Sequence, residues 1–486
     1  MDLRVMGADL RLEISHEREH RAQAARHVNA SEAKTLLILG ASGDLTSRLL
    51  LPGLGGLLAT GDVRCLKLIG SARADWNDEK WFQIIADSFA AVDARGKQVD
   101  ALVSSARYIK ADVSTGNDLR RLLDACDGVP ILYFALPPAV TIAACRTLGE
   151  LGVPDGTRLV VEKPFGTDAA SAQSFNKLLA ELVPEDQTFR VDHYLGMSTV
   201  LNILGLRFAN RIWETVLNAD HVARIEVNLD ECLALEGRAG YYDKAGALVD
   251  MLQSHALEVL ALLTMDAPPT LSARDVRDRI AQLIRAVHLR NDDPVSSSQR
   301  ARYTAGEIDG RVLPSYVDEQ GVDPSRMTET FAQVELEIRN WRWAGVPITM
   351  RAGKALDTLR KEVVITFKAP PCVPVGLTGY EFADRLRIGL DPDRMELRLN
   401  VNGSDDPTTL DPIQLGADLG PGRLPPYGQV LEAILNGNPI LSVRGDTVVD
   451  CWRIIDPVRR AWREGKVPMG EYAAGSSPPP ERRRAR

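Results

Sequence analysis

The stretch TLLILGASGDL, residues 35–45, decides the fold of the N-terminal part of the chain. Its apolar run, Leu36 to Leu39, predicts a buried strand that breaks at Gly40, and the following segment, 46–54, can begin a helix. Strand, glycine turn and helix in this order suit a dinucleotide, because glycines let backbone N–H groups approach the pyrophosphate and a helix N-terminus favours its charge. The predicted cofactor contacts are Gly40, Ala41, Ser42, Gly43, Asp44 and Leu45.

Short apolar runs alternate with helix-length stretches from this strand to residue 195, in the order LKLIG, ILYFALPP, RLVVEKPFG and FRVDHYLG. This alternation predicts βαβ units in a parallel sheet that is buried on both faces. We therefore expect a Rossmann-like, nucleotide-binding α/β domain over residues 31–195.

The pattern changes beyond residue 196 to longer extended segments: VARIEVNLDE, FAQVELEIRNW, KEVVITFK and MELRLNVN. Apolar and polar residues alternate in them, as in strands with only one face on a core. Residues 196–475 are therefore predicted to form an α+β domain with a large, mainly antiparallel sheet and helices, to which the family resemblance given below assigns substrate binding and dimerisation.

The composition excludes several classes of protein. At 486 residues the chain is long enough for two domains, and its net charge of −8 argues against nucleic acid as a partner. No run of 18 apolar residues suggests a membrane span. Six scattered cysteines without metal-ligand spacing favour a reducing cytoplasm and no metal. Residues 1–30 are predicted to be a helical or disordered extension, and 476–486 a disordered basic tail.

Arg73 follows the second apolar run, where an enzyme that uses NAD normally places an acidic residue for the ribose hydroxyls. A guanidinium suits the 2′-phosphate of NADP, so Arg73 is the predicted NADP contact. Asp75 lies two residues further on and leaves NAD open, and a plain surface cation is the structural alternative for Arg73.

Three further segments carry candidate chemistry. Lys163 leaves a buried strand just before Pro164, a candidate cis peptide, although a lysine at a strand end also simply reaches water. Asp192 and His193 follow another apolar run, and strand alternation would point them to opposite faces. His255 lies in a strongly helical apolar stretch, where a histidine is more often a core residue.

Nine motifs in register make the chain resemble the glucose-6-phosphate dehydrogenase family from about residue 35 to 475: GASGDL, YFALPP, VEKPFG, DHYLG, LRFAN, EGRAGYYD, DMLQSHAL, RWAGVPITMRAGKAL and YAAGS. The resemblance implies NADP-dependent oxidation of glucose 6-phosphate to 6-phosphogluconolactone in the pentose phosphate pathway. It also implies a cytoplasmic homodimer or homotetramer whose partner is a small sugar phosphate.

The resemblance also implies roles for individual residues. His255 would be the general base and Asp192 would stabilise its protonated form, whereas His193 and Tyr194 would hold the phosphate. Lys163 would contact the substrate and the nicotinamide. Sugar contacts would come from Glu231, Asp250 and Lys354.

The chain departs from the family pattern where the substrate binds. Met197 replaces a lysine that contacts phosphate, and Leu359 replaces a basic residue, although Arg360 and Lys361 follow and would substitute after a small backbone shift. Asp391 stands where a glutamine is common, and Ser254 replaces an asparagine before the histidine. Two alternatives therefore stay open: a weak or inactive paralogue with a regulatory or scaffold role, and a dehydrogenase of another sugar or sugar phosphate.

Overall fold

The computed structural model describes residues 33–63, 65–237, 239–379, 382–403 and 406–480. The predicted extension, 1–30, lies outside the described residues, as do residues 481–486 of the predicted tail. The chain divides into two compact units. Unit 1 consists of Met1–Glu162, Leu178–Phe189 and Tyr427–Pro439, and unit 2 of Lys163–Lys177, Arg190–Pro426 and Ile440–Arg486.

Unit 1 is built around a sheet with the strand order β3-β2-β1-β4-β5-β6. Its strands are β1 (Lys34–Leu39), β2 (Leu66–Ala72), β3 (Arg107–Lys110), β4 (Val129–Phe134), β5 (Arg158–Glu162) and β6 (Thr188–Val191). The pairs β1–β2, β1–β4, β2–β3 and β4–β5 are all parallel. The predicted α/β domain with a parallel sheet is therefore confirmed, although the short strand β3 was not foreseen.

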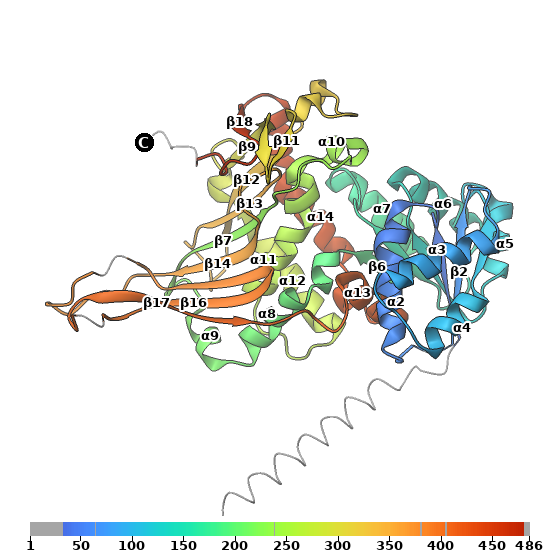
Figure 1. Cartoon of the computed structure of the whole chain (residues 1–486), viewed down its shortest axis with the longest axis horizontal. Helices are drawn as coiled ribbons and strands as arrows, with labels where there is room; N and C mark the ends of the chain where they lie inside the picture. The colour runs from blue at the N-terminus through green and yellow to red at the C-terminus, as the bar shows by residue number, and fades with distance from the viewer. Residues whose placement is uncertain (1–32, 64, 238, 380–381, 404–405, 481–486) are drawn as a thin grey trace, which may run out of the picture. The chain divides into compact units, whose positions relative to one another are not determined.

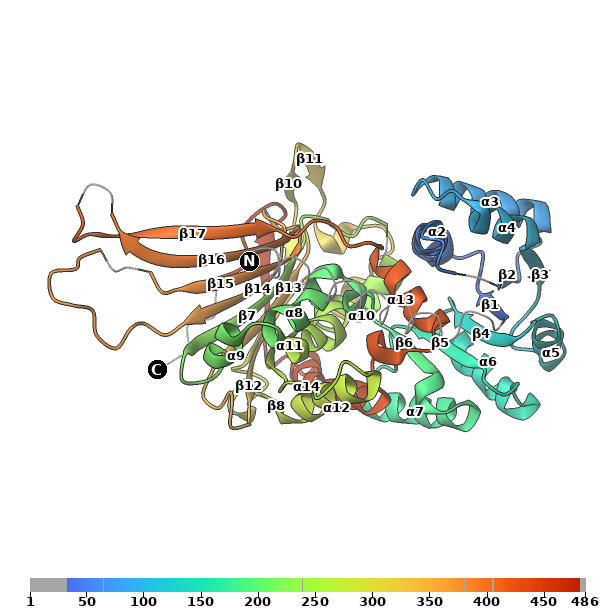
Figure 2. The ribbon, with the colours of Figure 1, turned by 90° about the horizontal axis from the view of Figure 1, so that it is seen from below.

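Helices cover both faces of this sheet, which explains why its strands read as continuous apolar runs. In Figure 2, α2, α3 and α4 lie on one face, and α5 and α6 on the other. Their bounds are α2 (Leu51–Ala59), α3 (Asp78–Ala90), α4 (Lys97–Ser105), α5 (Gly116–Asp124) and α6 (Pro138–Leu151). All six residues of β1 are buried.

Unit 2 contains a large sheet with the order β17-β16-β15-β14-β7-β13-β12-β9-β18, and β8 pairs with β12 (Figure 1). Its strands are β7 (Val222–Asp230), β8 (Val287–Leu289), β9 (Ser298–Thr304), β12 (Phe331–Ile338), β13 (Ile348–Gly353), β14 (Arg360–Phe367), β15 (Arg385–Asp391), β16 (Asp393–Asn402), β17 (Leu410–Asp418) and β18 (Met469–Ala473). Most pairs are antiparallel, but β13–β7 and β18–β9 are parallel. The predicted mainly antiparallel sheet is confirmed.

The helices of unit 2 lie on one face of this sheet (Figure 2). They include α8 (Ser198–Phe208), α10 (Ala239–Ala247), α11 (Leu257–Thr264), α12 (Ala273–Ala286) and α14 (Gly445–Arg463). The run Ala239–Thr264 has the length and composition of a membrane span, but 83% of its most apolar window is buried within the fold. This burial is typical of a core helix, so the run is weak evidence for a membrane.

Candidate active site

The site in unit 2 begins where β6 ends, at Val191. Asp192 caps a short 3₁₀-helix, η3 (His193–Gly196), because its Oδ1 accepts a hydrogen bond from the N–H of Tyr194 at 3.0 Å. The expectation that Asp192 and His193 point to opposite faces of a strand is therefore wrong. Polar atoms of both side chains lie within 4.8 Å of one another and of His255.

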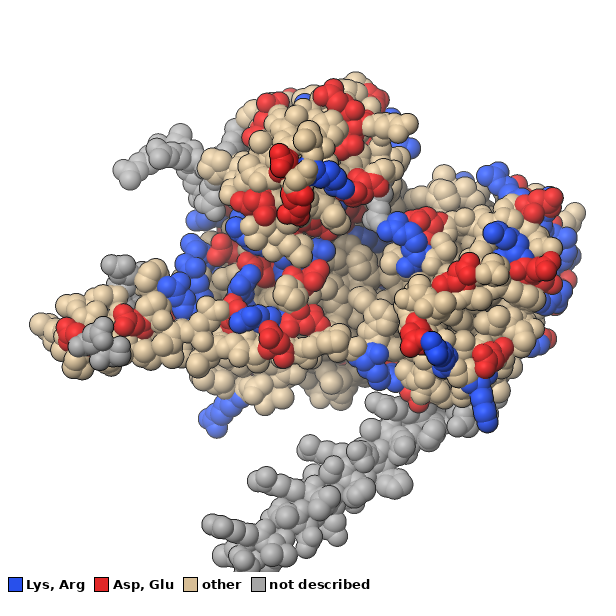
Figure 3. Space-filling view, in the orientation of Figure 1, with Lys and Arg blue, Asp and Glu red and all other residues tan. Residues whose placement is uncertain are grey.

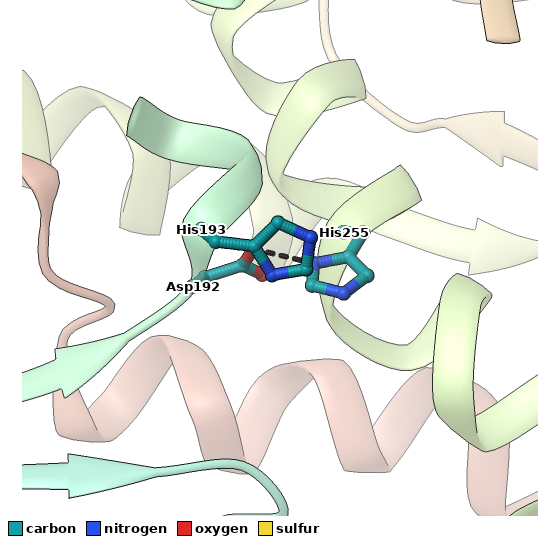
Figure 4. A group of neighbouring side chains, drawn as sticks. All are labelled: Asp192, His193 and His255. Carbon is teal, nitrogen blue, oxygen red and sulfur yellow. Dashed lines mark hydrogen bonds and ion pairs between the residues drawn. The ribbon is translucent and has the colours of Figure 1, made fainter. Parts of the chain in front are cut away.

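His255 reaches Asp192 from a neighbouring helical segment, η4 (Leu248–Ala256), which is a π-helix. The Nδ1 atom of His255 bonds to Oδ1 of Asp192, as the dashed line in Figure 4 shows. The hydroxyl of Ser254 donates to Oδ2 of the same carboxylate at 2.5 Å. Three donors therefore hold the buried carboxylate, and it fixes the orientation of the imidazole.

Two aromatic side chains of η3 pack against the His255 ring. Tyr194 stacks on it, with ring centroids 4.2 Å apart and planes inclined by 24°. His193 meets it edge-on at 4.7 Å. The imidazole is therefore restrained both by a hydrogen bond and by ring packing.

Lys163 lies on the other side of the imidazole. Its Nζ is 2.6 Å from Nε2 of His255 and donates to the backbone oxygen of Asp250 at 2.9 Å. The Lys163–Pro164 peptide is cis, as the sequence suggested. Since Nδ1 of His255 bonds to a carboxylate and Nε2 faces an ammonium, the consistent assignment has the proton on Nδ1 and a lone pair on Nε2.

The electrostatics favour an ionised aspartate and a neutral histidine. Burial would raise the pKa of Asp192, but the neighbouring His255 and Lys163 outweigh it, and the pKa is lowered. Burial lowers the pKa of His255, which Lys163 reinforces and Asp192 opposes. Burial and the proximity of His255 lower the pKa of His193 to about 3. The imidazole is therefore neutral, and its Nε2 lone pair can accept a proton from a substrate.

A second polar cluster joins β7 to the strands beside it. The ammonium of Lys354 contacts Glu231 Oε2 at 2.7 Å, and Lys361 contacts Oε1 at 3.3 Å. Lys361 also lies 3.8 Å from Asp391. Burial would raise the pKa of Glu231, but the two lysines lower it. The structure therefore brings together Glu231 and Lys354, two of the residues predicted to contact the sugar, and adds Lys361.

Electrostatic effects connect this cluster to His193 and Tyr194 of η3. Burial is the main cause that lowers the pKa of His193, and Lys361 adds to it. Burial likewise raises the pKa of Tyr194, and Glu231, Asp250 and Asp391 raise it further. Each carboxylate disfavours the tyrosinate, so the Tyr194 hydroxyl stays protonated and can donate a hydrogen bond. The predicted phosphate and sugar residues therefore share one polar region of unit 2.

Two of the residues that depart from the family pattern also fall in this region. Met197 directly follows η3 and is partly exposed, and its N–H donates to the Tyr194 carbonyl at 3.1 Å. Leu359 lines a pocket together with Arg360, Lys361 and Asp391. Burial is the main reason that the pKa of His193 is lowered, and the charges of Lys163 and Lys361 both add to it.

The ring nitrogens of His193 and His255 and the carboxylate oxygen of Asp192 lie close enough together to ligate one metal ion. However, Nδ1 of His255 and Oδ1 of Asp192 are already bonded to one another, and Nε2 of His255 faces the Lys163 ammonium. A cation at Nε2 would be repelled by that ammonium. The arrangement therefore fits proton transfer better than metal binding.

The predicted cofactor loop lies in unit 1, between β1 and η1 (Thr46–Leu50). Gly40 has φ +96°, and a Cβ there would lie 2.1 Å from the Ala135 oxygen, so only glycine fits. The N–H groups of Gly40 and Ala41 donate to the Ser71 oxygen at 2.8 and 3.0 Å. Among the described residues no partner takes the N–H of Ser42. A close glycine turn with a free N–H before a helix fits a pyrophosphate.

Arg73 and Asp75 differ in their surroundings in unit 1. The Asp75 carboxylate pairs with Lys110 at 2.9 Å. Arg73 is exposed, and within the described part of the chain its guanidinium forms no hydrogen bond or close ion pair, although its charge acts on Asp112. An exposed guanidinium at the end of β2 fits a phosphate ester, whereas the Asp75 carboxylate is already paired.

The sequence does not indicate the contacts that Ser254 and Lys361 make within the site. The contact of Ser254 with Asp192 joins residues 62 positions apart, so the sequence shows Ser254 only as a substitution. For Lys361 the sequence suggests, with Arg360, a substitute for the basic residue that Leu359 replaces, but not its contact with Glu231. Its position one residue into β14 was the available signal, because register places it opposite Leu229, two residues before Glu231.

Comparison with known proteins agrees with this organisation. Residues 37–202 match the glucose-6-phosphate dehydrogenase NAD binding domain, and residues 204–485 match the C-terminal domain of the same family. A glucose-6-phosphate 1-dehydrogenase of Gluconobacter oxydans is 35% identical, covering 93% of this chain and 96% of its own. One from Bacillus subtilis is 33% identical, covering 93% and 96%.

Solved structures give the same result. A glucose-6-phosphate 1-dehydrogenase from Mycobacterium avium has a TM-score of 0.80 and 29% identity, covering 92% of this chain and 94% of its own. A glucose-6-phosphate dehydrogenase in complex with glucose 6-phosphate has a TM-score of 0.81 and 28% identity, covering 92% and 96%. The chain therefore belongs to the glucose-6-phosphate dehydrogenase family.

Proposed function

We propose that this chain is an NADP-dependent glucose-6-phosphate 1-dehydrogenase, which oxidises the sugar at C1 to 6-phosphogluconolactone. The observation that carries the proposal is the buried Asp192–His255 pair, with Nε2 of the imidazole directed at Lys163. Family membership supplies the substrate class, and the geometry supplies a base of suitable protonation state.

His255 takes the proton of the anomeric hydroxyl at Nε2. The resulting imidazolium is stabilised by the Asp192 carboxylate, which Ser254 and the Tyr194 N–H hold in place. Bound NADP supplies the hydride acceptor. Lys163 moves from Nε2 to the substrate oxygen when the hydroxyl binds, since two donors cannot share one lone pair. A positioned base of this kind typically contributes about 10²- to 10⁴-fold to the rate.

We assign the phosphate to His193 and Tyr194, with Lys361 as a cation in place of the lysine that Met197 replaces. Lys361 acts electrostatically on His193 and is held by Glu231 and Asp391. Glu231, Asp250 and Lys354 are assigned to the sugar. Because neutral His193 and Tyr194 supply no positive charge, phosphate binding depends strongly on Lys361.

The cofactor is assigned to the loop Gly40–Leu45 and to Arg73. The Arg73 guanidinium also makes NADP the preferred cofactor. A guanidinium binds a phosphate ester through two parallel hydrogen bonds, and Asp75 is paired with Lys110 rather than free for ribose hydroxyls. Lys163 is the proposed contact for both nicotinamide and substrate. Residues 31–195 and 196–475 are the proposed cofactor and substrate domains.

We further propose a homodimer or homotetramer, located in the cytoplasm. Strands β16 and β17 leave Val401 and Leu415 exposed, by 37% and 54%, which suits contact with another copy.

All six cysteines are unpaired, as in a reducing compartment. On the face drawn in Figure 3, basic and acidic side chains are interspersed, which suits a small anionic substrate better than a polyanion. Light scattering after gel filtration tests the assembly.

A steady-state assay tests the proposed function. Purified chain is given glucose 6-phosphate or glucose, each with NADP or NAD, and reduction of the cofactor is followed. Activity with glucose 6-phosphate and NADP, lowered at least about 10²-fold in His255→Asn, is expected. A preference for unphosphorylated glucose would favour the dehydrogenase of another sugar, and silence with both sugars would favour a non-catalytic role.

A further inference from the structure

The segment Thr328–Thr330, just before β12, contacts three parts of unit 2 that lead to the site. The Thr328 hydroxyl donates to the backbone oxygen of Asp243 at 2.6 Å. Oε1 of Glu329 accepts the N–H of Leu248, the first residue of η4, at 3.0 Å. The backbone oxygen of Thr330 accepts the N–H of Lys354 at 2.9 Å. One segment therefore joins the helix that carries His255 to the backbone of Lys354.

The Glu329 carboxyl packs directly on Gly246. This glycine breaks the helical run with φ +68° and ψ 173°, immediately before η4. A Cβ at Gly246 would lie 2.2 Å from Oε1 of Glu329 and 2.6 Å from its Cδ. The N–H of Ala247 also donates to the backbone oxygen of Glu329, at 3.3 Å. The start of η4 is therefore fitted closely to this one carboxyl group.

We propose that Glu329 is a positioning residue whose ionised carboxylate fixes the start of η4 and thereby places His255 for proton transfer. The inference rests on the proposed function and deepens it, since Glu329 acts on the base without touching the substrate. The physical reason is that an ionised carboxylate is a stronger acceptor than a neutral one, and negative charge is favourable at the N-terminus of a helix.

The surroundings of Glu329 make its charge sensitive near neutral pH. Burial raises its pKa to about 7, whereas the Leu248 N–H, its own N–H, Arg300 of β9 and Arg459 of α14 lower it. Tyr242 of α10 and Tyr316 of η6 (Tyr316–Asp318) also interact with the carboxyl, and both stay protonated at this pH. The contact with Leu248 therefore weakens as pH falls through about 7.

The test compares Glu329→Gln with the wild-type chain from about pH 5.5 to 9, using saturating glucose 6-phosphate and NADP. Glutamine retains the size and an acceptor oxygen but resembles the protonated carboxyl at every pH. We expect kcat about 5-fold below wild type above pH 8, equivalent to one charge-assisted contact replaced by a neutral one. The two curves should converge below pH 6.5, because only the wild type loses a charge near pH 7.

Two further variants serve as tests. One keeps the negative charge of Glu329 but loses its hydrogen bond to Leu248, and the other removes a carboxylate elsewhere, on β12. Glu329→Asp retains the charge but is one methylene too short to reach the Leu248 N–H, so kcat should fall at least about 5-fold above pH 8. Glu337→Gln, on β12 and paired with Arg339, should match the wild type at every pH. An aspartate variant with wild-type kcat would show that the contact is irrelevant and would overturn the inference.

Thermal unfolding at pH 6 and pH 8 distinguishes positioning from a merely structural role. Because the folded pKa of Glu329 is raised, the wild type loses stability as pH rises from about 4.5 to 7. Glu329→Gln should not lose stability over this pH range. At pH 8 it should be at least as stable as the wild type, although its kcat is lower. If Glu329→Gln had both a lower kcat and a lower stability than the wild type at pH 8, the inference would be refuted. A pH profile of kcat identical to that of the wild type would refute it as well. An inactive wild type would refute only the proposed function, because the unfolding data test the ionisation separately.

Discussion

Replacing Asp192 by asparagine isolates the charge of the dyad. Oδ1 of Asp192 accepts from the Tyr194 N–H and bonds to His255, whereas Oδ2 accepts from Ser254. The Tyr194 N–H selects the carbonyl oxygen of the asparagine for the Oδ1 position. His255 therefore keeps its proton on Nδ1, and the amide N–H₂ of the asparagine faces the Ser254 hydroxyl, which can accept.

The expected loss follows from the negative charge that would stabilise the imidazolium. Exchanging a charged hydrogen-bond partner for a neutral one costs about 1–1.5 kcal/mol, which is the lower limit. A full Coulomb term for unit charges about 4 Å apart is about 4 kcal/mol at an effective dielectric constant of about 20. The sum of about 5 kcal/mol is an upper limit, because water and neighbouring dipoles reorganise. We therefore expect kcat to fall about 10²- to 10³-fold.

The measurement is the pH dependence of kcat and of kcat/KM with glucose 6-phosphate and NADP. The Asp192 carboxylate raises the pKa of His255, so its removal lowers that pKa, and the acid limb of kcat/KM should move to lower pH. KM should change less than about 3-fold, because the base acts mainly in the transition state. Asp243→Asn is the control, since Asp243 is also a buried acceptor, bonded to Tyr316 and Arg326. It should lower stability without moving the acid limb. Retention of more than about a tenth of kcat, or an acid limb at higher pH, would refute the reasoning.

Four other substitutions follow from the same site. Met197→Lys should tighten glucose 6-phosphate binding about 10-fold without an equal gain for glucose; no gain for either sugar would mean that the pocket serves another ligand. Lys361→Met should raise KM for glucose 6-phosphate about 10-fold and leave glucose unaffected, and an equal loss for both sugars would assign Lys361 to general structure. Arg73→Ala should weaken NADP by about 10-fold and NAD hardly at all; equal losses would contradict the assignment, and isothermal titration measures both. Ser254→Ala should lower kcat about 5-fold at constant KM, with partial recovery in Ser254→Thr; an unchanged kcat would show that its hydrogen bond to Asp192 is dispensable.

The architecture was predictable because its strongest signals are local. Leu36 to Leu39 lie in a strand buried on both faces, and the glycine turn after it has a fixed conformational requirement at Gly40. Strand β3 was missed because its four residues, Arg107–Lys110, hold only Tyr108 and Ile109 between two charged residues, which is too short an apolar run to indicate a strand. Its place at the edge of the sheet comes from pairing with β2, which no local signal encodes.

The site was less accessible to sequence reasoning, because its geometry depends on where secondary structure ends. Continuing β6 through His193 predicts opposite faces for Asp192 and His193. Instead the Asp192 side chain accepts the N–H two residues ahead and caps a 3₁₀-helix, as short polar side chains commonly do. Likewise, the sequence predicted a helix around His255 but gave no indication that this part is π-helical. In a π-helix the turn is wider, which changes the direction of every side chain from Leu248 to Ala256.

The Glu231 carboxylate connects the proposed sugar and phosphate contacts. It binds Lys354, which the family pattern supplies, and Lys361, whose pairing with Glu231 the sequence did not indicate. A sugar hydroxyl that bonds to Glu231 must compete with these ammonium groups, whereas a phosphate must draw Lys361 away from it. The two exchanges favour one another, because the sugar hydroxyl takes the place of Lys361 on Glu231 while Lys361 moves to the phosphate. Glucose alone cannot accomplish the second exchange, so this chain can select a phosphorylated sugar even with Met197 and Leu359 in place of two basic residues.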